Sequence, residues 1–198
     1  MSTADIAARR PLPRIVLADL VPGALARDAV LVVGGAGLTG LAAQVSVHTS
    51  LSPVPFTLQT LAVLITGAAL GTVRGAVSML LYLLAGMAGV PWYADHHHGW
   101  GGPNFGYVIG FVVAAAVVGE LARRGNDRQV VSTIGLMALG SALVYVFGAT
   151  WLAHDLNWSA SHAISKGVTP FLISDALKAA VAAVVLPVTW RLVRSPKS

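Results

Sequence analysis

Long apolar stretches dominate the chain, and short polar segments separate them. Six stretches are apolar enough to predict transmembrane helices, at residues 28–47, 58–70, 75–90, 107–121, 130–152 and 171–192. A spanning helix needs about 20 mainly apolar residues, so the second and third stretches are short. They are separated only by residues 71–74, which predicts a tight helical hairpin. The pattern predicts an all-α integral membrane protein with six transmembrane helices in one bundle.

The composition supports this class. Of 198 residues, 56% are hydrophobic and 11% are charged, whereas about a quarter of the residues of a soluble domain are charged. The 21 glycines are spread through the apolar stretches, as in membrane helices that pack closely. We therefore expect a multi-pass membrane protein, embedded in the lipid bilayer. The net charge of +5 does not indicate a nucleic-acid partner, because in a membrane protein the placement of charge matters more than its sum.

Basic residues gather on one side of the predicted helices. In chain order they are Arg9, Arg10, Arg14, Arg27, Arg74, Arg123, Arg124, Arg128, Arg191, Arg194 and Lys197. The opposite loops contain only Lys166, and Lys178 lies inside the last helix. Because short cytoplasmic loops carry the excess of positive charge, both termini are predicted to be cytoplasmic. This divides the chain into a cytoplasmic arm (1–26), a transmembrane domain (27–193) and a cytoplasmic tail (194–198).

Motifs for several chemistries are missing. The chain has no GxxxxGK[ST] loop and cannot energise transport with ATP by itself, and the GxSxG and HExxH patterns are absent. We predict a protein that is not an enzyme and needs no cofactor. His96, His97 and His98 invite a metal interpretation, but adjacent loop histidines point in different directions and no second ligand cluster is evident. A solvated loop without a metal site is the expectation.

Asp175 and Lys178 are the sharpest feature, because residues three apart share one face of a helix. Ionisable side chains inside a membrane cost about 2.5 to 3.5 kcal/mol each, and they persist when they pair or line a polar cavity. One interpretation is a structural pair that holds the last helix to its neighbours. The other is a ligand pocket in which Asp175 accepts from N–H groups and Lys178 donates. The nearness of the pair to the Lys166 end of the helix favours a pocket open to the outside.

Two further regions hold candidate binding residues. The loop at 91–107 is rich in glycine and aromatic residues, and it can form either a lid over a ring-containing ligand or an aromatic belt at the membrane surface. Gln59 lies in the first turn of the second helix, near the outer face. It either contacts a ligand or satisfies nearby backbone groups.

Several separated segments carry recognisable motifs. They are residues 53–62 (PVPFTLQTLA), 67–71 (GAALG), 74–78 (RGAVS), 80–91 (LLYLLAGMAGVP), 106–111 (GYVIGF) and 167–178 (GVTPFLISDALK). Together they resemble the BioY family, the biotin-specific substrate-binding component of energy-coupling factor (ECF) transporters. The resemblance covers residues 29–186. The chain departs from the family pattern in the loop at 91–107, where GPNFGY stands in place of the GPTGGY of many relatives and the histidine run is unfamiliar.

The resemblance implies six helices, an outward-facing biotin pocket, and a transmembrane coupling protein with paired ATPases as partners for high-affinity biotin uptake. It implies that Asp175 and Lys178 contact the ureido ring of biotin, with Asn104 and Tyr107 as the next candidates. Gln59 and Trp100 complete the predicted biotin site. Two other functions stay open: an ECF component for another vitamin, and a non-transporting membrane protein with a structural Asp-Lys pair.

Small residues on the first helix suggest a partner surface. ECF components commonly present such residues to the coupling protein, and Ala36 and Gly40 stand four apart, a spacing that lets helices approach closely. We predict a coupling-protein interface at Ala36 and Gly40, with packing inside the bundle as the alternative. The sequence leaves open whether the chain works alone, as a homo-oligomer, or only with ATPase partners.

Overall fold

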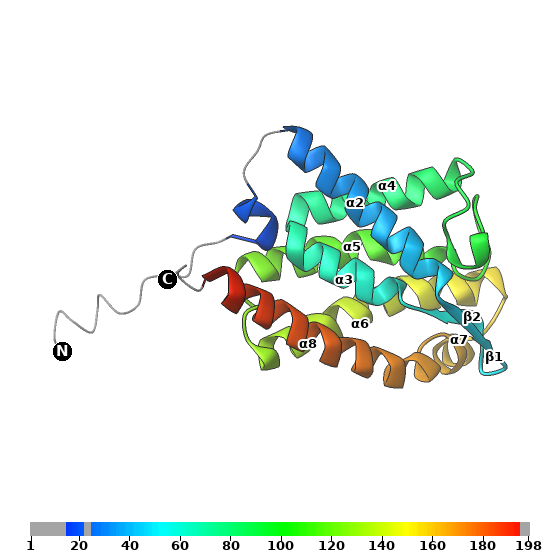
Figure 1. Ribbon diagram of the computed structural model, residues 1–198. Helices are drawn as coiled ribbons and strands as arrows, with labels where there is room; N and C mark the ends of the chain where they lie inside the picture. The colour runs from blue at the N-terminus through cyan, green and yellow to red at the C-terminus, as the bar shows by residue number, and fades with distance from the viewer. Residues whose placement is uncertain (1–14, 22–24, 195–198) are drawn as a thin grey trace.

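The computed structural model describes residues 15–21 and 25–194, and its helices form one bundle (Figure 1). The elements, in order, are η1 (Leu17–Leu20), α2 (Leu25–Gln44), β1 (Ser46–Thr49), β2 (Ser52–Thr57), α3 (Gln59–Leu70), α4 (Thr72–Met87), η2 (Ala94–His96), α5 (Phe105–Arg123), α6 (Val130–Asp155), α7 (Ala160–Gly167), η3 (Thr169–Phe171) and α8 (Leu172–Arg194).

Six of these helices match the six predicted stretches: α2, α3, α4, α5, α6 and α8. Within the described residues, four segments are long and apolar enough to cross a membrane: α2, α5, α6 and the stretch of 160–193 that contains α8. Helices α3 and α4 are shorter, as expected. Large apolar side chains such as Leu41 and Ile173 stand exposed on the outside of the bundle, where an integral membrane protein meets lipid.

The tight hairpin between α3 and α4 depends on Gly71. Its φ of +83° lies in a region that side-chain-bearing residues rarely adopt, and it joins the two helices without further linker residues. Gly119 on α5 packs directly on this turn, since a Cβ atom there would overlap the Gly71 backbone. The hairpin prediction is confirmed, and α5 lies at the centre of the bundle against α3, α4 and α6.

A β hairpin and a short helix at one end of the bundle were not predicted. Strands β1 and β2 pair antiparallel, with Ser46 opposite Thr57, in a segment that the apolar pattern leaves as a loop. Helix α7 is capped by Ser159, whose hydroxyl accepts from the His162 N–H at 3.3 Å. The fold is therefore helical with a small hairpin. We call this end of the bundle, which carries β1, β2, η2 and α7, the cavity end (Figure 1).

The opposite end is closed by η1. Val16 is 1% exposed, and it packs against Gly71. Arg74 donates to Asp19 at 2.8 Å. Burial alone would raise the pKa of Asp19, but the hydrogen bonds from Arg74 and Val16 outweigh it. The pKa of Asp19 therefore falls below its usual value. The charged Asp19 thus holds the described part of the predicted arm on the bundle. Residues 1–14, 22–24 and 195–198 of the predicted arm and tail lie outside the described residues.

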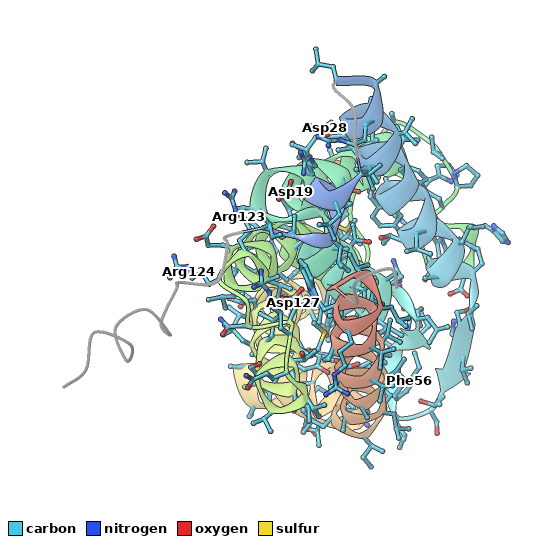
Figure 2. The ribbon with its side chains drawn as sticks, turned by 60° about the vertical axis from the view of Figure 1, so that its left-hand side comes forward. Asp19, Asp28, Phe56, Arg123, Arg124 and Asp127 are labelled. Atoms are coloured by element: carbon cyan, nitrogen blue, oxygen red, sulfur yellow. The ribbon has the colours of Figure 1, made fainter. Side chains whose placement is uncertain are left out.

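Charged residues gather at this η1 end. Figure 2, which brings it forward, labels Asp19, Asp28, Arg123, Arg124 and Asp127 there. Phe56, by contrast, lies on β2 at the cavity end. The described ends of the chain, η1 and the C-terminal part of α8, therefore share one end of the bundle with these charges (Figure 1).

Candidate ligand-binding site

A cavity of about 270 Å³ opens at the cavity end of the bundle. Residues of α3, α5, α6 and α8 line it from inside the bundle, and the β hairpin and the loop at 88–104 form its rim. Its volume is close to the lower end of the range for small-molecule sites, about 300 to 1,000 Å³. Five of the six residues predicted to bind ligand line it: Gln59, Asn104, Tyr107, Asp175 and Lys178.

Asp175 and Lys178 form the centre of a polar group that joins three helices. Lys178 Nζ on α8 donates to Asp175 Oδ1 and to Thr60 Oγ1 on α3, both at 2.8 Å. The Tyr145 hydroxyl on α6 donates to Asp175 Oδ2 at 2.6 Å. The Asp175 and Lys178 side chains are 9% and 13% exposed, and both line the cavity. The pair can therefore be structural and line a ligand pocket at the same time, since the two residues neutralise each other and both face the cavity.

Asn104 supplies a buried acceptor without a partner. It precedes α5, and its backbone carbonyl accepts from the N–H groups of Tyr107 and Val108. Its side chain forms no capping hydrogen bond, and Oδ1 is buried with no hydrogen-bond partner. A buried acceptor left unpaired costs about 1 to 3 kcal/mol. An N–H donor on a bound ligand would remove that cost.

Aromatic rings form the apolar part of the cavity. Phe56 on β2 stacks on Phe171 with ring centroids 4.5 Å apart, and Phe171 lines the cavity with Phe111. The Tyr107 ring also lines the cavity, while its hydroxyl donates to the Gly167 carbonyl at 2.8 Å and so holds the end of α7. Flat apolar walls of this kind suit a ring-shaped ligand.

Gln59 and Trp100 differ from the other predicted binding residues. The Gln59 amide donates to the Tyr82 hydroxyl at 2.8 Å and accepts from the Thr57 hydroxyl at 3.0 Å. Both ends of this amide are thus engaged with neighbours, although with side chains rather than backbone groups. Trp100 is 71% exposed and lies outside the cavity lining, but its ring packs on Phe105, which lines the cavity. The structure does not bring Trp100 to the cavity.

The loop at the rim is firmly attached to the bundle. The Gln44 amide donates to the carbonyls of Trp92 and Tyr93, both at 3.2 Å, and the Tyr93 hydroxyl donates to Leu83 at 2.6 Å. Burial raises the pKa of Tyr93 to about 12, so its hydroxyl stays a donor at neutral pH. Asp95 joins the loop to β1, because it accepts from the Ser46 hydroxyl at 2.5 Å.

The two α2 residues predicted to contact a partner, Ala36 and Gly40, lie inside the bundle. Ala36 is fully buried, and a Cβ atom at Gly40 would stand 3.2 Å from Trp92, so both residues face the bundle. This geometry agrees with the alternative of internal packing. Two glycines of α2, Gly34 and Gly37, have open space beside them, because no atom lies within 4 Å of a Cβ position there.

Sequence reasoning missed several residues of the site. Tyr145, Thr60, Phe56 and Phe111 all lie at or beside the cavity, and none was a candidate. A hydroxyl inside an apolar helix, as at Tyr145, was the available signal. Its partner Asp175 is 30 residues away, and the sequence does not show which helices are neighbours.

Comparisons with known proteins identify the family. The BioY family matches residues 12–195. A probable biotin transporter BioY of Pyrococcus horikoshii is 36% identical over 81% of this chain and 94% of its own length. The biotin transporter BioY of Thermotoga maritima is 34% identical, over 68% of this chain and 80% of its own.

The fold also has a solved counterpart. It is the crystal structure of the S-component for biotin from an ECF-type ABC transporter, which matches with a TM-score of 0.75 at 20% identity, over 84% of this chain and 92% of that one. At this identity the likeness shows the fold. The family match and the relatives show more: this chain is a member of the BioY family.

Proposed function

We propose that this protein captures biotin in the cavity and takes part in biotin uptake across the cytoplasmic membrane. The observation that carries the proposal is the Asp175-Lys178 pair at the wall of a small-molecule cavity in a member of the BioY family. The relatives that share this family are named biotin transporters. The protein acts by binding and moving its substrate, and it is not an enzyme.

The polar groups of the cavity match the ureido ring of biotin, which has two N–H donors and one carbonyl acceptor. Asp175 keeps acceptor capacity, because each oxygen accepts a single recorded hydrogen bond. The unpaired Oδ1 of Asn104 is a second acceptor. Lys178 has three N–H donors, of which Asp175 and Thr60 take two, so the third can donate to the ureido carbonyl.

The apolar walls take the remainder of the bicyclic ligand. The rings of Tyr107, Phe111 and Phe171 are rigid, and they bury apolar ligand surface without losing much side-chain freedom. Trp100 supports this wall from outside through Phe105. Gln59 contributes to the lining while its amide holds Tyr82 in place.

In the proposed orientation six helices span the membrane, both termini are cytoplasmic and the cavity opens to the outside. The positive-inside rule supports this, because Arg123 and Arg124 lie at the end of the bundle opposite the cavity. Short spans such as α3 are tolerated where neighbouring helices cover them.

The sequence has no phosphate-binding loop, so the chain cannot energise transport with ATP by itself. The proposed partners are an ECF transmembrane coupling protein and its ATPases. Gly34 and Gly37 on the open side of α2 allow a partner helix to approach closely. A second copy of this chain is the other candidate for that surface.

The experiment is equilibrium binding of labelled biotin to the purified protein, in competition with a panel of other vitamins. The proposal predicts saturable binding that only unlabelled biotin displaces. Displacement by a different vitamin would support an ECF component of other specificity. Absence of binding for the whole panel would support a non-transporting protein with a structural ion pair.

A further inference from the structure

The rim of the cavity carries three histidines from two segments that are far apart in the sequence. His48 lies on β1, while His97 and His98 follow η2 in the loop between α4 and α5. All three line the cavity and are exposed to solvent. The neighbouring His96 is exposed too, but it does not line the cavity.

One of these imidazoles is already paired. His48 Nε2 lies 3.0 Å from Asp95 Oδ2, and the other oxygen of Asp95 accepts from Ser46. Asp95 and Asp175 are the two carboxylates in the lining of the cavity. No hydrogen bond or ion pair is recorded for the side chains of His97 and His98 within residues 15–21 and 25–194.

The backbone fixes where these two side chains stand. Asp95 and His96 both have a φ of 59°, which turns the chain sharply before His97. The turn is closed by the hydrogen bond from the His97 N–H to the Ala94 carbonyl at 3.2 Å, and the Tyr93 N–H donates to the His97 carbonyl at 3.1 Å. His97 and His98 are therefore held at the rim by the same segment that Asp95 joins to β1.

The inner part of the cavity is unsuited to a second carboxylate. Among the residues that line this inner part, Lys178 is the only lysine or arginine. The charge of Lys178 is already matched by Asp175. A ligand carboxylate placed there would face Asp175, and like charges at close range repel. A ligand with a polar ring and an anionic tail therefore fits with the ring inside and the tail toward the rim.

We propose that His97 and His98 form the subsite for the carboxylate tail of the ligand. The inference rests on the proposed biotin function, and it names the residues that recognise the charged end of biotin. Imidazole N–H groups donate to carboxylates, and the hydrogen bond is stronger when the imidazole is protonated. These histidines make the site select an acid over a neutral amide of the same shape.

The test compares biotin with biotinamide, which has the same ring and tail length but no charge. Equilibrium binding is measured at pH 6 with the purified parent protein and with the double variant His97→Gln, His98→Gln. The parent is expected to bind biotin about tenfold more tightly than biotinamide, the size of one charge-assisted hydrogen bond. The double variant is expected to lose this preference by losing biotin affinity, while its biotinamide affinity stays unchanged. His96→Gln is the matched control, and it should behave like the parent.

The pH dependence gives a second readout. Imidazoles as a class gain a proton between about pH 8 and pH 5. The titratable and charged groups at the cavity and its rim are His48, Tyr93, Asp95, His96, His97, His98, Tyr107, Tyr145, Asp175 and Lys178. Biotin affinity of the parent should rise by about three- to tenfold from pH 8 to pH 6, and biotinamide affinity should stay flat. In the double variant the affinity for biotin should not rise between pH 8 and pH 6.

Three outcomes overturn the inference. The first is a double variant that keeps the parent's preference for biotin, and the second is an equal loss of both ligands, which would mean that the histidines only shape the loop. The third is a pH effect that biotinamide shares, which would assign the titration to a group that contacts the ring. If the parent binds neither ligand, the proposed biotin function itself has failed, a result distinct from these three.

Discussion

The Tyr145 hydroxyl donates a hydrogen bond to Asp175 Oδ2 at 2.6 Å and so links α6 to α8 at the cavity wall. Lys178 occupies the other oxygen of the same carboxylate. The Asp175 side chain is thus fixed from two sides before any ligand enters. A carboxylate held in this way can accept from a ligand without first losing rotamer freedom, which favours tight binding.

Replacing Tyr145 with Phe removes the hydroxyl while it keeps the ring. We expect biotin affinity to fall about fivefold, because Asp175 loses a partner that orients it, a change of about 1 kcal/mol. Binding should be followed by isothermal titration. Thr150→Val on the same helix is the control, since the Thr150 hydroxyl bonds the Val146 carbonyl rather than the carboxylate. A similar loss in both variants would mean that Tyr145 has no specific role at Asp175.

Asn104→Ala separates ligand binding from stability. The Asn104 side chain forms no cap on α5, and its buried Oδ1 lacks a partner, so truncation removes an unsatisfied acceptor. The ligand-free variant should therefore melt at the parent's temperature or above it. Its biotin affinity should fall by about five- to tenfold, because one ureido N–H loses its acceptor. A variant that melts lower and binds biotin as the parent does would contradict this role.

Single cysteines test the orientation, since the natural chain contains none. Ala160 lies at the start of α7 at the cavity end, and Asn126 lies between α5 and α6 at the opposite end. In intact cells an impermeant maleimide should label Ala160→Cys directly and Asn126→Cys only after permeabilisation. The reverse labelling pattern would overturn the outward-facing cavity.

Large substitutions on α2 distinguish bundle packing from partner contact. Ala36→Trp should lower stability and biotin binding together, because Ala36 is fully buried. Gly37→Trp points into open space, so the isolated protein should bind biotin normally. Uptake by cells that also supply the coupling protein and ATPases should drop, since an indole prevents close helix contact. Unchanged uptake would mean that this side of α2 meets only lipid.

The sequence predicted the helical part of the fold because long apolar stretches have few alternatives to a membrane helix. The α3–α4 hairpin followed from the short spacer at Gly71. The β hairpin could not be predicted in the same way, since Pro53 and Pro55 indicate extended chain but do not name a pairing partner. Helix α7 has few apolar residues, and its cap at Ser159 is a local signal too weak to stand alone.

The site was only partly predictable for the same reason. Asp175 and Lys178 could be found because their spacing of three residues is a local pattern. Tyr145 and Thr60 join them through contacts across 30 and 118 residues, which depend on how the helices pack. The packing of Ala36 and Gly40 inside the bundle could not be predicted for a related reason. Small residues mark a close approach, but the sequence does not show whether the neighbour is inside the bundle or outside it.

The most direct test of the central claim is the binding of labelled biotin to the purified parent protein, Asp175→Asn and the matched control Asp155→Asn. Asp155 is an exposed carboxylate at the end of α6, outside the cavity lining. We predict one saturable site in the parent and in the control. Asp175→Asn should bind about 30-fold more weakly, because a loss of about 2 kcal/mol follows when Lys178 is left without its charged partner. Equal affinity of all three proteins for biotin would contradict the assignment of the cavity as the biotin site.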